Sequence, residues 1–168
     1  AVKKDKKLTI AVVGTGSSIL AGPDGPPSAY PARLEAALKQ KLPSVAVKVV
    51  TLVRTRMTAA DLAQGMEKLL VDEKPNLVIW QTGTLDAIRR IEPDDFRSAL
   101  DEGVETLHRG GADVILMNMQ YSPRTARLES KSGAMRPCIQ RRSPDSVIAT
   151  RSYSTCSPAC ARFNIGRM

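Results

Sequence analysis

The chain has 168 residues, the length of one ordinary domain and enough to bury a substantial hydrophobic core. Hydrophobic residues make up 42% of it, yet no apolar run reaches the roughly 18 residues that a membrane-spanning helix needs. Most of the formal net charge of +8 lies in residues 125–168, and aromatic residues are too sparse at 4% to form a base-stacking surface. We therefore expect neither a membrane span nor a nucleic-acid partner.

The first 124 residues alternate between strand and helix patterns. Apolar runs rich in β-branched residues predict strands near 8–13, 45–52, 77–81 and 113–119. Apolar side chains at helical spacing predict helices near 29–42, 58–73 and 93–109. Thr58 and Asp61 resemble a capping box at the start of the second helix.

This alternation predicts an α/β fold: a three-layer α/β/α, flavodoxin-like parallel sheet with right-handed crossovers. The strand order 2-1-3-4 places the reversal between strands 1 and 3, where ligands bind in such sheets. Loops at Ser17–Ser18 and at 83–86 would then flank one crevice, with residues 54–58 beside it. Trp80 and Met117 lie inside buried strand patterns, so we expect them in the core.

Residues 125–168 form a basic tail rich in Ser, Arg, Pro and Cys, which completes or trails the domain formed by residues 1–124. Its one notable apolar run is 147–149, and it shows no amphipathic helix. The tail holds all the cysteines, Cys138, Cys156 and Cys160. They form no CxxC pair and lack a nearby histidine, so we expect no zinc site. One disulfide and three free thiols both remain open.

The glycine-rich turn that follows the first strand, Gly14 to Ser18, allows three readings. It is a cradle for phosphate at a helix N-terminus, a tight turn of small residues, or a catalytic loop that presents two hydroxyls. The full GxGxxG pattern of dinucleotide-binding proteins is absent, because its sixth position is Ile19.

Four segments, in order and at the right intervals, resemble the SGNH (GDSL-type) esterases over about residues 8–124. They are GSSILAG at 16–22, YPARLEAAL at 30–38, TGTLDAIR at 82–89 and VILMNMQYSPR at 114–124. The resemblance implies that Ser18 is the nucleophile and that Ser17 replaces the usual aspartate. It also implies that the backbone N–H groups of Ser18 and Arg56 bind the oxyanion, with Arg56 at a family glycine position.

The resemblance also marks departures from the family. Leu85 aligns with the asparagine whose side chain donates to the oxyanion, and leucine cannot donate. The implied crevice is completed by Ser17, Gly83, Thr84, Asp86 and Tyr121.

The late Asp-x-x-His block that supplies the family's base is not found. The one histidine, His108, ends the third predicted helix, which places it at the opposite edge of the sheet from Ser18. The resemblance therefore predicts a lipase-like serine esterase that acts on a small ester or acyl substrate without metal or organic cofactor. The departures from the family predict that its catalytic activity is weakened. The alternative is a non-catalytic SGNH-like domain that binds a small acyl or sugar ligand.

A chain starting at Ala1 without a visible secretory segment leaves periplasmic, secreted and cytoplasmic locations open, and the oligomeric state is open too.

Overall fold

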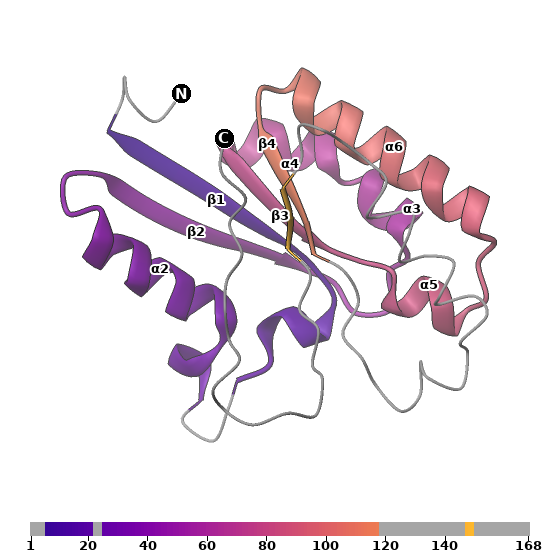
Figure 1. The fold of residues 1–168 in the computed structure, drawn as a ribbon, viewed down its shortest axis with the longest axis horizontal. Helices are drawn as coiled ribbons and strands as arrows, with labels where there is room; N and C mark the ends of the chain where they lie inside the picture. The colour runs from indigo at the N-terminus through magenta and orange to yellow at the C-terminus, as the bar shows by residue number, and fades with distance from the viewer. Residues whose placement is uncertain (1–5, 22–24, 118–146, 150–168) are drawn as a thin grey trace.

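The computed structural model of the chain describes residues 6–21, 25–117 and 147–149. Its sheet has the order β2-β1-β3-β4-β5, and every neighbouring pair is parallel (Figure 1). The strands are β1 (Lys7–Gly14), β2 (Ala46–Val53), β3 (Leu77–Gln81), β4 (Asp113–Met117) and β5 (Val147–Ala149). The predicted parallel sheet and the order of its first four strands are confirmed. The fifth strand is the short apolar run of the tail, which pairs with β4.

Helices cover both faces of this sheet, so the three-layer arrangement is confirmed (Figure 1). α2 packs on one face, and α3, α4 and α6 pack on the other. The helices are α2 (Tyr30–Lys41), α3 (Ala59–Ala63), α4 (Met66–Glu73), α5 (Thr84–Ile88) and α6 (Pro93–Arg109), with 3-10 turns η1 (Gly16–Ile19) and η2 (Pro26–Ser28).

The sheet divides the core into two clusters because successive side chains of a strand point to opposite faces. Ala11 and Val13 of β1 face the cluster under α6, whereas Ile10 and Val12 face the cluster under α2. Burial on both faces explains why β1 is a continuous apolar run. Trp80 is fully buried under α6, as predicted. Met117 is half-buried and packs against the α2 cluster.

The predicted helix over 58–73 is wrong in one respect, because the structure divides it into α3 and α4. The Gly65 N–H donates to the Leu62 carbonyl. This i to i+3 bond is of the 3-10 type and tightens the end of α3. Glycine lowers helix stability by about 1 kcal/mol relative to alanine, which favours a break at this position. The predicted capping box is confirmed: Thr58 Oγ1 accepts from Asp61 N–H, and Asp61 Oδ2 accepts from Thr58 N–H.

The segment predicted as a loop after β3 contains the short helix α5, a second correction. Gly83 precedes it with φ of +97°, a left-handed conformation that glycine adopts without steric cost. Five residues are too few to show a helical period, so the pattern could not reveal it. The observed ends of β1, α2 and β2 each differ by one residue from the predicted ends. The last two residues predicted for the fourth strand lie outside the described residues.

In the part of the chain that the structure describes, no helix has both the length and the apolar character needed to cross a membrane.

Candidate active site

The carboxyl ends of β1 and β3 meet at the point where the strand order reverses. β1 ends at Gly14 and β3 at Gln81, and the preceding residues Val13 and Trp80 are register partners. The turn η1 leaves β1 here, and the loop to α5 leaves β3 beside it. The fold therefore brings the two predicted crevice loops to one edge of the sheet, where parallel α/β folds bind their ligands.

Ser18 lies in η1 with its side chain buried and only 2% of the residue exposed. Its hydroxyl Oγ donates a hydrogen bond of 2.7 Å to the side-chain carbonyl Oε1 of Gln81. Its backbone N–H donates to the carbonyl of Thr15 at 2.8 Å. The N–H that the resemblance assigns to the oxyanion is thus occupied in this structure, and it must leave Thr15 or be shared to serve that role.

Gln81 completes a short polar chain at this edge. Its amide nitrogen Nε2 lies 3.4 Å from Ser17 Oγ and donates to it, while its carbonyl accepts from Ser18. Gln81 is 5% exposed and Ser18 is 2% exposed, so water has little access to the hydrogen bond between them. The sequence reasoning missed Gln81. The available signal was a polar residue that ends a buried apolar strand at the carboxyl edge of the sheet.

Gly14 provides the space that Ser18 occupies. A Cβ atom at Gly14 would overlap Ser18 Oγ and would lie 3.3 Å from both the Cβ and the carbonyl oxygen of Gln81. Only glycine leaves room for this serine side chain in its present position.

Arg56 has a left-handed backbone with φ of +63°, a conformation that favours glycine. This agrees with the family glycine that the resemblance places there. Its side chain is exposed, and its carbonyl accepts a hydrogen bond of 2.9 Å from Arg89 Nη2. Because of this bond, α5 is tied to the loop after β2.

A small hollow lies between these loops. It is lined by Thr15, Met57, Gln81, Thr82, Gly83, Thr84, Leu85 and Asp86. Three predicted crevice residues, Gly83, Thr84 and Asp86, line the hollow together with the apolar Leu85 at the family asparagine position. Ser17, Ser18 and Arg56 lie outside this lining, and Tyr121 lies outside the described residues.

Asp86 lines the hollow but is engaged elsewhere. Its carboxylate Oδ1 accepts a 2.8 Å hydrogen bond from the backbone N–H of Ala59, the first residue of α3, and the residue is 2% exposed. Burial raises the pKa of Asp86 above the ordinary 3.8, partly opposed by the Ala59 N–H. Asp86 thus joins α5 to the start of α3, and its carboxylate is engaged with the Ala59 N–H rather than with Ser18.

Removing this acceptor should destabilise the fold. Asp86→Ala leaves the buried Ala59 N–H without a partner, which should cost about 1–3 kcal/mol of unfolding free energy. Asp86→Asn keeps an acceptor oxygen and removes the charge. Since the folded pKa is raised, the native carboxyl destabilises the fold increasingly as pH rises from about 3.8 through the folded pKa. The advantage of Asp86→Asn over the parent should therefore grow across that range.

Urea unfolding at several pH values measures both effects, with Asp95→Asn on the exposed surface of α6 as the matched control. An equal loss for Asp86→Ala and Asp86→Asn at neutral pH would contradict the role of the carboxylate oxygen as acceptor.

His108 lies at the edge of the sheet opposite Ser18, as predicted. It is exposed in the last turn of α6, and α6 leads directly into β4. β4 begins at Asp113 beside Leu77, the first residue of β3. His108 thus sits near the amino edge of the sheet, opposite the carboxyl edge that carries Ser18.

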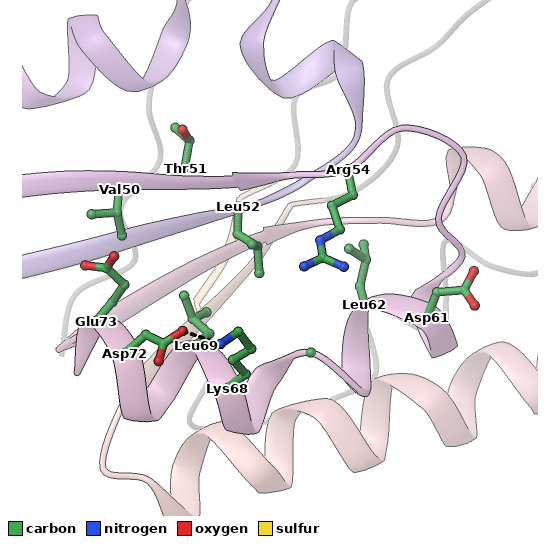
Figure 2. A pocket seen from close by; sticks show the side chains of 11 residues that line it. Val50, Thr51, Leu52, Arg54, Asp61, Leu62, Lys68, Leu69, Asp72 and Glu73 are labelled. Carbon is green, nitrogen blue, oxygen red and sulfur yellow. Dashed lines mark ion pairs between the residues drawn. The ribbon is translucent and has the colours of Figure 1, made fainter.

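A larger hollow lies elsewhere, between β2 and the α3–α4 pair (Figure 2). Its floor is apolar, from Val50, Leu52 and Leu69, and its rim carries the ion pair between Lys68 and Asp72 at 3.0 Å. None of the predicted site residues that the structure describes lines it. The larger hollow and the predicted site therefore lie at different places in the fold. Among the described residues, no three His, Cys, Asp or Glu side chains are grouped to hold a metal ion.

Comparisons with known proteins report on the family and the fold of this chain. The sequence profile of the non-GDSL lipase-like family matches residues 1–136. A search of curated proteins gives no match. Many solved structures share the fold, and three of them serve as examples. AlinE4, described as an SGNH-hydrolase family esterase, is 23% identical over 84% of this chain and 75% of its own, with a TM-score of 0.68.

TesA is 26% identical over 79% of this chain and 74% of its own, with a TM-score of 0.63. The psychrotrophic esterase EstA from Pseudoalteromonas sp. is 15% identical over 84% of this chain and 76% of its own, with a TM-score of 0.64. The profile covers most of the chain, and the solved structures have the same sheet and helix arrangement.

Proposed function

This chain belongs to the non-GDSL lipase-like family, and on that premise we propose that it hydrolyses a carboxylic ester with Ser18 as nucleophile. One observation carries the proposal: Ser18 lies buried at the carboxyl end of β1, where the strand order reverses beside the hollow at α5. The solved esterases with this fold support an ester as the substrate class.

The proposed reaction has two steps. Ser18 Oγ attacks the acyl carbon, the ester C–O bond breaks, and the serine proton ends on the departing oxygen, so that the alcohol leaves. Water then hydrolyses the acyl-serine, releasing the acid and restoring the hydroxyl. The backbone N–H groups of Ser18 and Arg56 would stabilise the oxyanion, although the first is bonded to Thr15 in the resting structure.

Two features of the site make this reaction slow. The partner of the Ser18 hydroxyl is the amide carbonyl of Gln81, which accepts a hydrogen bond but does not take up a proton at neutral pH. The one histidine in the sequence, His108, lies at the other edge. In the part of the chain that the structure describes, the Ser18 hydroxyl has an amide rather than a base as its partner. A positioned general base contributes about 10²–10⁴-fold to such reactions, so we expect a rate lower by a comparable factor.

The same features favour a second function, a binding domain without catalysis. Leu85 lines the hollow with an apolar side chain, and the Ser18–Gln81 bond keeps the hydroxyl engaged. A small acyl ligand would then be held in the hollow and released unchanged.

We expect this polypeptide to hydrolyse short-chain p-nitrophenyl esters weakly or not at all, for the reasons above. Any enzymatic rate should disappear in Ser18→Ala and persist in His108→Ala. Ser98→Ala, an exposed serine on α6, is the matched control. Circular dichroism verifies the fold of each variant.

The outcomes separate the two functions. A rate unchanged in Ser18→Ala, together with NMR shifts at Leu85 and Thr84 on adding a short fatty acid, would favour the binding domain. A rate lost in His108→Ala with the fold intact would contradict the topological argument that separates His108 from Ser18.

A further inference from the structure

We propose that Gln81 is a positioning residue that holds Ser17 and Ser18 together and keeps the Ser18 hydroxyl in its neutral, hydrogen-bonded form. This inference rests on the proposed function of Ser18 as nucleophile and deepens it. It assigns part of the low reactivity that we expect of the site to one residue at the end of β3.

The bond that carries the inference is short and buried. The Ser18 Oγ to Gln81 Oε1 distance of 2.7 Å is typical of a well-formed O–H···O hydrogen bond. The exposed fractions are 2% for Ser18 and 5% for Gln81, so water competes little for either group. Such bonds are stronger in a buried site than in water because the local dielectric is low.

The side chain of Gln81 has little freedom to move away. Its backbone is held in the sheet, where Gln81 is the register partner of Met117 of β4. On the other side it packs against Gly14, since even a Cβ added there would lie only 3.3 Å from the Gln81 Cβ. Its amide nitrogen lies 3.4 Å from Ser17 Oγ, a long hydrogen bond that favours the orientation in which the carbonyl faces Ser18.

This arrangement makes the chemistry of position 81 decisive for Ser18. The amide carbonyl accepts the hydroxyl proton without removing it, so Oγ stays a weak nucleophile. A carboxylate of the same shape at this place would accept the proton as Oγ attacks. With a fluorophosphonate probe, Oγ bonds to phosphorus, fluoride leaves, and the proton ends on the carboxylate.

The hydrogen bond itself is tested by NMR on the full chain, without any activity. The side-chain amide signals of Gln81 are assigned on the parent chain by through-bond connection to its backbone signals. We expect them to shift in both Ser17→Ala and Ser18→Ala, while those of the exposed Gln64 stay unchanged. Gln81 signals unchanged in Ser18→Ala would overturn the proposal, and this measurement decides alone if Gln81→Glu does not fold.

The consequence is tested by labelling with a fluorophosphonate, followed by mass spectrometry over a range of pH. We expect Gln81→Glu to label Ser18 about 100-fold faster than the parent, the lower range of a positioned general base. The rate should rise with pH through one carboxyl ionisation and then level off. Gln81→Met, which has no carboxylate, should show no such rise, and Gln64→Glu should match the parent.

The outcomes distinguish the two claims. The role of Gln81 would be overturned if Ser18 were labelled no faster in Gln81→Glu than in the parent, or as fast in Gln81→Met as in Gln81→Glu. Either result would leave Ser18 as the nucleophile. An adduct that persists in Ser18→Ala would instead contradict the proposed function, and the NMR shifts would still decide the hydrogen bond.

Discussion

Replacing Gly14 with alanine should abolish the reactivity of Ser18. A Cβ at this position would overlap Ser18 Oγ, and it would lie 3.3 Å from the Gln81 carbonyl oxygen, which belongs to the sheet and cannot yield. The serine side chain must therefore rotate away from Gln81. We expect labelling of Ser18 by a fluorophosphonate to fall at least about 100-fold, comparable to losing a positioned catalytic group. The unfolding free energy should fall by about 1–3 kcal/mol, as for overpacked sites.

Gly16→Ala is the matched control for this prediction, because it places the same methyl group in the same turn. Its Cβ would lie 3.8 Å from Thr55 Cγ2, an ordinary van der Waals contact. Labelling of Gly14→Ala at the rate of Gly16→Ala would contradict the geometry described for Ser18.

Replacing Leu85 with asparagine should accelerate ester hydrolysis about 100- to 1000-fold, the factor that one oxyanion donor contributes. Leu85 is half-buried and lines the hollow at the first turn of α5. Asparagine is slightly smaller, so it fits the same place and supplies a side-chain N–H. The gain should be in kcat/KM for p-nitrophenyl acetate, and it should vanish when Ser18→Ala is added.

Ile88→Asn adds the same amide to α5 at an exposed position, where 45% of the isoleucine is exposed, and should leave the rate unchanged. An equal rate for Leu85→Asn and the parent would place Leu85 away from the oxyanion and would favour the binding-domain function.

The sheet was predictable because its strands are buried on both faces. β1 and β3 are continuous apolar runs, and their alternation with helical patterns is sufficient to predict parallel pairing and the order of four strands. The bounds of the helices were less predictable from the sequence. The division at Gly65 depends on a local turn, and α5 is too short to show a period.

The candidate site was predictable only where small residues mark a turn at the end of a strand. Gly14 to Ser18 and Gly83 mark turns at strand ends, so the meeting of their loops followed from topology. The roles of Gln81 and Asp86 did not follow. Each depends on a bond to a residue far along the chain: Ser18 for Gln81, and the Ala59 N–H for Asp86. No local pattern encodes such a partner.

Peptide mapping of the adduct left by a fluorophosphonate on Leu85→Asn tests most directly whether Ser18 is the nucleophile of an esterase site. The adduct should lie on Ser18 and be absent when Ser18→Ala is added to the same background. Ser17 provides an internal control, since the same Gln81 amide contacts both hydroxyls. An adduct on Ser17, or one that survives the loss of the Ser18 hydroxyl, would contradict the assignment of Ser18.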